Sequence, residues 1–141
     1  MKRYRNEKGN ALIETAITMP IVLLVCVGIF EFGRAYQTSQ VLTNAAREGA
    51  RLAILEGPTD AEVRTRVNQY LTDGGLASLA DGNIVIGRNT VLTASSTAST
   101  VTVNYPFQFM MLNPIVRLIV PTDSTTGAPI TLTAATLMRN E

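Results

Sequence analysis

The residues best placed to do chemistry stand at the start of the first apolar run of the sequence. Glu14 is an acidic residue at the edge of that run, and Gly9 precedes it by five positions. An ionisable residue within a membrane segment is costly, so its presence indicates a function. A cut after Gly9 would make Asn10 the N-terminus, with its α-amine about one helical turn from the Glu14 carboxylate. Such a pair, within one subunit or between neighbours, offsets the cost of burying either charge.

Side chains that most enzymes use are missing. There is no histidine, which removes the usual general base, the Ser-His and Cys-His nucleophile pairs and the commonest metal ligand. Cys26 is the only cysteine, so there is no CxxC site and no intrachain disulfide. It lies inside the apolar run, where a thiol is a small hydrophobic group. We therefore expect no enzymatic activity and no metal or other cofactor.

The charges of the chain are balanced in number but not in position. The 12 basic and 11 acidic residues give a net charge of +1, which argues against nucleic acid as a partner. By the positive-inside rule, the basic residues before the apolar run place the N-terminus in the cytoplasm. They include both lysines of the chain and are Lys2, Arg3, Arg5 and Lys8.

The apolar run is long enough to cross a membrane. Residues 16–30 carry no charge, and the 22 residues from Ala11 to Phe32 make a helix of about 33 Å. A bilayer hydrocarbon core is about 30 Å thick. A secretory signal peptide is the rival interpretation, but it requires a small-residue cleavage site that the following residues lack. We therefore expect a retained anchor.

The spacing of apolar residues predicts two helices. Helical periodicity continues beyond the apolar run until Gly57-Pro58, so the first helix is expected from about Ala11 to Glu56. Pro20 is expected to kink it, or to leave a carbonyl that lipid or a partner satisfies. Thr59 and Glu62 have capping-box spacing at the start of a second helix, which is about 12 residues long.

The remainder of the chain predicts strands at residues 83–87, 90–93, 100–107 and 129–138, with a turn at 94–100. Pro106 is expected to end its strand or to lie at a sheet edge. The apolar stretch 109–121 is expected to fill the core as a loop, with an exposed assembly patch as the alternative. The predicted fold is α+β and pilin-like. It has a long N-terminal helix, half transmembrane and half amphipathic, a short second helix and a small antiparallel sheet.

Small residues recur every four positions in the amphipathic half of the first helix, at Ala45, Gly49 and Ala53. This spacing lets another backbone approach closely. Two alternatives stay open, because the partner is either another subunit or the sheet of the same chain.

Charged residues mark the outward side of the same helix and its exit from the membrane. Arg47, Glu48 and Arg51 form either a solvated face or a partner contact, and Glu48 can pair with Arg51 at i, i+3. Glu31 and Arg34 have the same spacing and are expected to anchor the helix at the interface.

Residues 9–56 resemble the TadE-like pseudopilins of tight-adherence (Tad, Flp-type) pilus systems. The basic leader, the glycine and the glutamate look like a prepilin processing site. The end of the last predicted strand is similar too. Where major pilins of this system often carry tyrosine after the glutamate, this chain has Thr15, which favours a minor pilin or pseudopilin. The four matching elements are Gly9 with Glu14, Met19-Pro20, EFGR at 31–34 and NAAREGAR at 44–51.

The resemblance implies cleavage between Gly9 and Asn10 by a prepilin peptidase on the cytoplasmic side. Residues 1–9 would be the leader, 10–33 the transmembrane helix and 34–141 an extracytoplasmic pilin-like domain. Without the leader, 8 of the 12 basic and 10 of the 11 acidic residues remain, a net charge of −2.

The implied function is assembly of a Tad pilus for surface adhesion, at the bacterial inner membrane or within the pilus. Other pilins or pseudopilins and the Tad inner-membrane assembly proteins are the implied partners. The alternative is an uncleaved single-pass membrane subunit of an envelope complex, which gives no reason for an acidic residue at Glu14.

Overall fold

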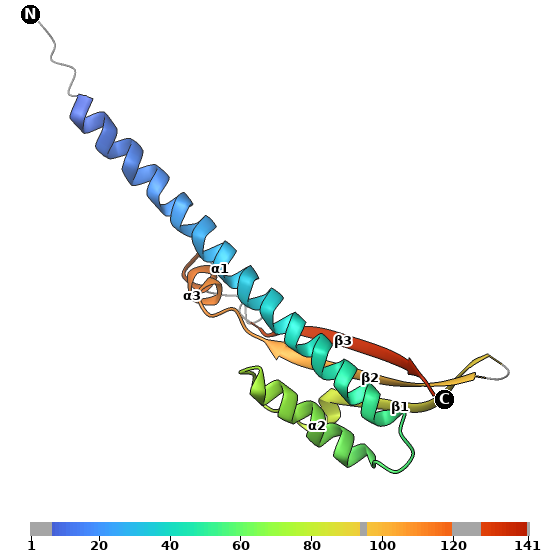
Figure 1. The fold of residues 1–141 in the computed structure, drawn as a ribbon. Coiled ribbons are helices and arrows are strands. Elements are labelled where there is room, and N and C mark those ends of the chain that lie inside the picture. The colour runs from blue at the N-terminus through green and yellow to red at the C-terminus, as the bar shows by residue number, and fades with distance from the viewer. Residues whose placement is uncertain (1–6, 94–95, 120–127, 141) are drawn as a thin grey trace, which may run out of the picture.

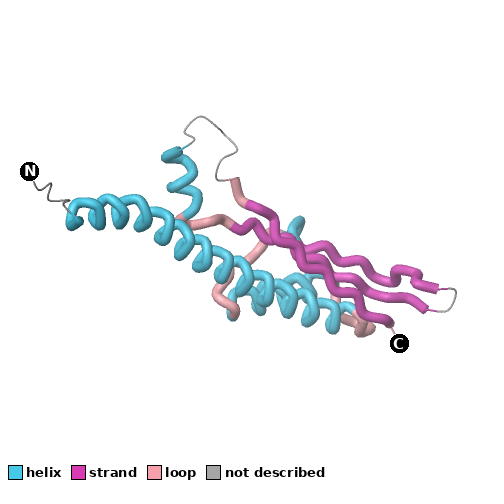
Figure 2. Tube along the Cα trace, turned by 90° about the horizontal axis from the view of Figure 1, so that it is seen from above, coloured by secondary structure: helices cyan, strands magenta, loops and turns pink. Residues whose placement is uncertain are grey.

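The chain folds into one long helix that projects from a small α+β domain (Figure 1). The computed structural model describes residues 7–93, 96–119 and 128–140. The second half of α1 lies across the sheet with α2 beside it, and the first half extends away (Figures 1 and 2). The predicted fold class is confirmed. The elements are α1 (Glu7–Ala53), α2 (Asp60–Asp73), the 3-10 turn η1 (Asp81–Asn83), β1 (Ile84–Thr93), β2 (Ser96–Phe107), α3 (Leu112–Ile119) and β3 (Ile130–Arg139).

Helix α1 is continuous from Glu7 to Ala53 and passes through Pro20 without a break. It begins a turn earlier than the sequence predicts and ends three residues earlier. Gly57, four residues beyond that end, has a φ of 124°, which is open to glycine but strained for other residues. The basic residues of the expected leader, Lys8 apart, lie outside the described residues.

Helix α2 starts with the predicted capping box. The Glu62 N–H donates to Thr59 Oγ1 at 3.3 Å, and the Thr59 N–H donates to Glu62 Oε2 at 2.7 Å. The Thr59 N–H and hydroxyl lower the pKa of the Glu62 carboxyl, because both donate to its charged form. The cap is therefore formed at neutral pH and weakens as the pH falls through that lowered pKa.

The sheet is antiparallel, in the order β1-β2-β3. The predicted alternation along β2 is confirmed, since Val101, Val103 and Phe107 are buried. The prediction of two separate strands at 83–87 and 90–93 is wrong, because β1 runs through both with a register shift between Gly87 and Thr90.

The predicted turn at residues 94–100 is wrong for its described part. Residues 96–100 belong to β2, because this polar stretch extends the ladder with β1 and β3. Ser99 is buried there, and its hydroxyl donates to the Ala53 carbonyl at the end of α1, at 3.4 Å.

Pro106 stands inside β2 but beyond the end of its pairing with β1. The last β1 pair is Ile84 with Val103, whereas Pro106 pairs with Thr131 of β3. At this point β2 has one neighbour, so a residue without an N–H is tolerated. β2 is the central strand of the sheet and ends at Phe107, so the edge alternative is wrong and Pro106 marks the end of its strand to within one residue.

The core fills the space between α1, α2 and the inner face of the sheet. All of its members come from residue 42 onward, so the first half of α1 contributes nothing to it. The chain thus holds a domain with its own core and an apolar helix that this core does not need. The buried members are Leu42, Ala45, Ala46, Ala50, Ala53, Val63, Val67, Leu71, Leu79, Ile84, Val101, Val103 and Ala134.

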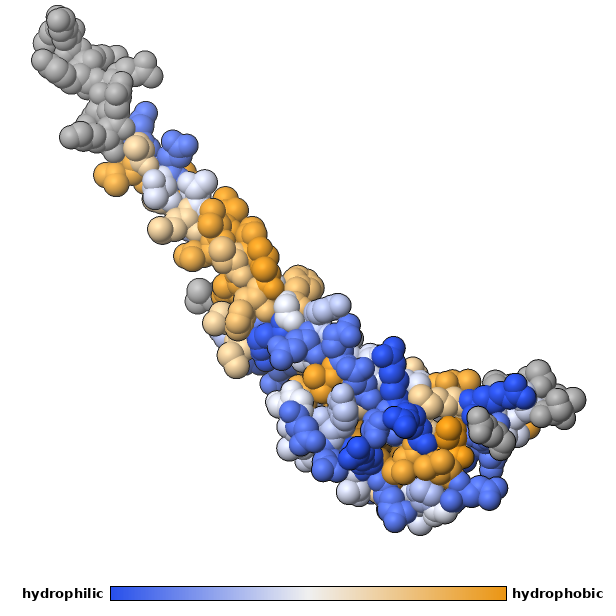
Figure 3. Space-filling view, in the orientation of Figure 1, coloured by the Kyte–Doolittle hydropathy of each residue, from blue (hydrophilic) through white to orange (hydrophobic). Residues whose placement is uncertain are grey.

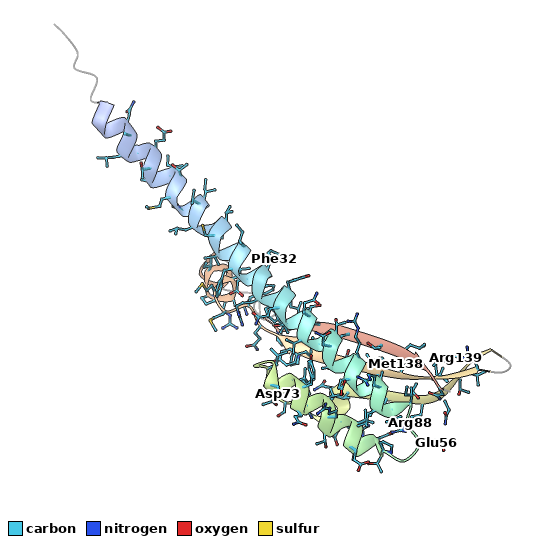
Figure 4. The ribbon with its side chains drawn as sticks, viewed as in Figure 1. Phe32, Glu56, Asp73, Arg88, Met138 and Arg139 are labelled. Carbon is cyan, nitrogen blue, oxygen red and sulfur yellow. The ribbon has the colours of Figure 1, made fainter. Side chains whose placement is uncertain are left out.

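Arg88 of β1 fastens the end of α1 to the start of α2. Its Nε donates to Asp60 Oδ1 at 2.7 Å, its Nη1 to the Ala53 carbonyl at 3.2 Å and its Nη2 to the Pro58 carbonyl at 2.7 Å. Arg88 lies near Glu56 at the domain end of α1 (Figure 4). The planar guanidinium suits three acceptors at once, which a lysine ammonium does not.

We expect Arg88→Met to lower the free energy of unfolding by about 1–2 kcal/mol, since it removes three charge-assisted hydrogen bonds from a partly exposed side chain. Urea unfolding measures the loss. Arg66→Met is the matched control, because Arg66 makes an exposed bridge to Glu48 at 3.0 Å and such bridges contribute about 0–1 kcal/mol. Equal losses in the two variants would contradict the role of Arg88 as a fastener.

Candidate membrane and assembly site

The first half of α1 is an apolar rod that the rest of the chain leaves uncovered. Among the described residues, α1 is the one helix long and apolar enough to cross a membrane. In Figure 3 this half is mostly hydrophobic, with polar side chains toward its free end, and the domain beyond it is largely polar on the face shown. An exposed apolar surface of this extent marks a membrane or protein interface. Its large exposed side chains are Leu12, Ile13, Ile17, Met19, Ile21, Val22, Leu23, Leu24, Val25, Ile29, Phe30 and Phe32.

Polar groups on this rod are bonded within the helix itself. The Thr15 hydroxyl donates to the Ala11 carbonyl at 2.9 Å, and the Thr18 hydroxyl donates to the Glu14 carbonyl. Hydroxyls bonded in this way need no water, so they suit a segment that lies in lipid.

The predicted processing residues lie in the first turns of α1. Gly9 is partly exposed and Asn10 is exposed. Asn10 and Glu14 are four residues apart on one helix, so they share a face. Glu14 is exposed, and no described residue forms a hydrogen bond or ion pair with its carboxylate. Cleavage after Gly9 and the assembly role of Glu14 stay predictions.

At the other end of the rod, Glu31 joins α1 to the segment that follows β2. Its carboxylate is fully buried, accepts from Arg34 Nη1 at 3.0 Å and accepts from the backbone N–H of Met111. The Arg34 guanidinium lies 5.4 Å from the Phe107 ring centroid, and that ring packs edge-on against Phe109. We call these five residues the exit clasp.

The exit clasp corrects the interpretation of Glu31 and Arg34 as a simple interfacial anchor. Their pairing is as the spacing predicts, but Glu31 is buried by a segment 80 residues away in sequence. No local pattern could reveal that contact.

The expectation that residues 109–121 fill the core as a loop is also wrong over its described part. Met110 and Met111 are 64% and 45% exposed, and Leu112–Ile119 forms helix α3. Pro114 falls in the first turn of α3, where proline is tolerated. A proline at such a position is compatible with the start of a helix, so Pro114 could have indicated α3 in the sequence. Residues 120 and 121 lie outside the described residues.

The small-residue ladder of α1 packs within the chain. Ala45, Gly49 and Ala53 are all buried. A Cβ atom at Gly49 would stand 2.6 Å from Val67 Cγ2 of α2 and 3.3 Å from Val101 Cγ1 of β2. Of the two alternatives, the ladder therefore faces its own helix and sheet.

The charged residues beside the ladder divide into two kinds. Glu48 bridges to Arg66 of α2 at 3.0 Å and also pairs with Arg51 at 3.8 Å, so it helps to hold α2 against α1. Arg47 and Arg51 are exposed. A partner contact through Arg47, Glu48 and Arg51 stays a prediction.

Among the residues that the structure describes, no three His, Cys, Asp or Glu side chains come together as metal ligands. Cys26 is exposed on the apolar rod.

An uncovered apolar helix, long enough to cross a membrane, and the small α+β domain that it carries define a pilin-like fold. A family model described as TadE-like protein matches residues 9–51, a range that lies within α1. The resemblance is confirmed over that range, and it implies a membrane protein associated with the Tad pilus. The TadE-like family is a structural component of that pilus and not a family of enzymes. No curated protein and no solved structure matches the chain.

Proposed function

We propose that the chain is a TadE-like pseudopilin or minor pilin that takes part in assembling a Tad pilus for surface adhesion. The observation that carries the proposal is that the family match and the uncovered part of α1 fall on the same residues. The TadE-like match at residues 9–51 covers both the uncovered apolar rod and Glu14, whose carboxylate has no bonding partner among the described residues. Because the domain does not cover the apolar rod, its surface can contact lipid before assembly and other subunits in the pilus.

In this proposal the N-terminus is cytoplasmic and residues 34–141 lie outside the inner membrane. Residues 1–9 are removed by the prepilin peptidase, and residues 10–33 span the bilayer. Other pilins or pseudopilins pack against the apolar rod. Tad inner-membrane assembly proteins bind the extracytoplasmic domain. Arg47 and Arg51 are candidates for those contacts, because their charges point away from the core.

Cleavage after Gly9 is the direct test. We expect mass determination of protein from native membranes to show a chain that begins at Asn10. Gly9→Leu should leave the full-length chain, because a bulky residue replaces the small one at the cut. Gly28→Leu is the matched control, since Gly28 lies on the same helix with nothing within 4 Å of an added Cβ, and it should be processed normally.

The opposite result would favour the alternative. If the native chain retains Met1 to Gly9 while the peptidase is active on another pilin, the protein is an uncleaved single-pass membrane subunit.

A further inference from the structure

We propose that the segment from Phe109 to Arg117 rests on the outer surface of the bilayer, with Met110 and Met111 among the acyl chains. We call this segment the membrane foot. The inference rests on the proposed function, because it requires α1 to span a membrane. It adds a second lipid contact, made by a part of the domain distant in sequence from the anchor.

The exposure of the membrane foot is the first observation. Met110 and Met111 are 64% and 45% exposed, and neither belongs to the buried core. Several other exposed apolar side chains of the domain, such as Val91, lie on the sheet, whereas these two are adjacent in sequence and lie next to the apolar rod. Two adjacent flexible apolar side chains on a surface point to an apolar partner.

The position of the membrane foot is the second observation. The Met111 N–H donates to the Glu31 carboxylate, so Met111 stands at the level of Glu31 along α1. Helix α3 contacts α1, and two views at right angles place it where the projecting half leaves the domain (Figures 1 and 2). Phe32, which is 68% exposed, lies at the same level (Figure 4). The methionines therefore continue the apolar surface of the rod at its outer end.

The length of the apolar rod determines how deep in the bilayer the membrane foot lies. The 22 residues that end at Phe32 span about 33 Å as a helix, against a hydrocarbon thickness of about 30 Å. Glu31, Phe32 and the two methionines then fall at the boundary between acyl chains and headgroups. Tilt of the helix lowers them further into the bilayer.

The chemistry of the surrounding hollow matches a phospholipid. A hollow of about 610 Å³ is lined by Arg34 and Arg117 together with Phe109, Met110 and Pro114. Guanidinium groups suit phosphate oxygens, and the apolar side chains suit the upper acyl chain.

Tryptophan fluorescence can test the proposal cleanly, because the chain contains no tryptophan. Single variants Met110→Trp, Leu23→Trp and Val91→Trp of the full chain would be reconstituted in phosphatidylcholine vesicles with and without brominated acyl chains, which quench tryptophan on contact. Leu23 lies in the apolar rod. Val91 is 72% exposed and pairs with Thr97, about 33 Å along β2 from Phe107.

We expect Met110→Trp to lose emission nearly as strongly as Leu23→Trp, while Val91→Trp keeps its emission. Quenching of Leu23→Trp without quenching of Met110→Trp would overturn the membrane foot and leave the anchor standing. An unquenched Leu23→Trp would overturn the membrane-spanning role itself. A blue-shifted but unquenched Met110→Trp would show that protein, such as a second copy, covers the patch. Quenching of all three would place the whole domain on the bilayer. Both of these last outcomes overturn the proposal.

Discussion

Gly49→Leu is expected to lower the stability of the domain, and so its melting temperature, well below that of the wild-type chain. A Cβ at this position already stands 2.6 Å from Val67 Cγ2, with Val101 Cγ1 at 3.3 Å and Val63 Cγ1 at 3.7 Å. Valine side chains are stiff at χ1, so they cannot turn aside without moving their backbones. Overpacking typically costs about 1–3 kcal/mol, and a whole isobutyl group in a site closed to one carbon should reach or exceed about 3 kcal/mol. That is a large part of the stability of a small domain, which is about 5–15 kcal/mol.

Thermal unfolding followed by circular dichroism would measure the loss, in the full chain in detergent and in a fragment of residues 34–141. Gly33→Leu in the full chain is the matched control, because Gly33 lies on the same helix with nothing within 4 Å of its Cβ position. It should keep the melting temperature of the wild type. A Gly49→Leu domain as stable as the control would contradict the close packing of Gly49 against Val67 and Val101.

A double variant identifies the contact responsible. Gly49→Ala adds only the Cβ, and Val67→Ala removes the methyl group that it meets. If this contact dominates, the double variant should be more stable than the sum of the two single losses predicts, because neighbours that share a contact are not additive.

Much of the helical part of this fold follows from local sequence. Spacing of apolar residues predicts α1 and α2, and Thr59 and Glu62 predict the capping box that the structure shows. The alternation along β2 predicts which side of the strand is buried. In these cases the signal and the structure involve residues within a few positions of each other. The TadE-like resemblance falls in the same class, since it rests on a single helix.

The remaining features depend on partners that are distant in sequence. Arg88 fastens carbonyls 30 and 35 positions earlier, and Glu31 is buried through a backbone group 80 positions later. An arginine in a strand and a glutamate at a membrane boundary look the same in sequence whether they are solvated or bonded. These partners could be named only once the arrangement of the helices and the sheet in space was known.

The internal packing of the ladder narrows the surfaces left for assembly. Because Ala45, Gly49 and Ala53 are covered by α2 and β2, that face of α1 is closed to another subunit. The apolar rod is the large surface of α1 that remains free for close helix packing. Contacts between subunits in a filament would therefore concentrate on residues 10–33, where Glu14 is the one acidic residue before Glu31.

Glu14→Ala is expected to leave membrane insertion intact or to improve it, and to abolish assembly. Insertion improves because the substitution removes a charge from the apolar rod. Assembly fails because the α-amine of Asn10, created by cleavage, then has no carboxylate to meet when helices pack. Leaving one partner of a buried pair without the other costs about 3–5 kcal/mol, and each 1.4 kcal/mol lowers an equilibrium constant tenfold.

Two measurements separate assembly from the earlier steps. The mass of Glu14→Ala from the membrane fraction should still begin at Asn10, and the amount of the chain recovered in sheared pili should fall below detection. Thr18→Ala is the matched control, because Thr18 lies one turn further along the same face and its hydroxyl is bonded within the helix. The Thr18→Ala chain should assemble normally. Normal incorporation of Glu14→Ala into pili would rule out a required pairing of Glu14 with the Asn10 amine. A further variant, Glu14→Gln, tests the charge directly: it keeps the length and hydrogen-bonding capacity of the side chain, so a failure as complete as that of Glu14→Ala assigns the effect to the lost negative charge.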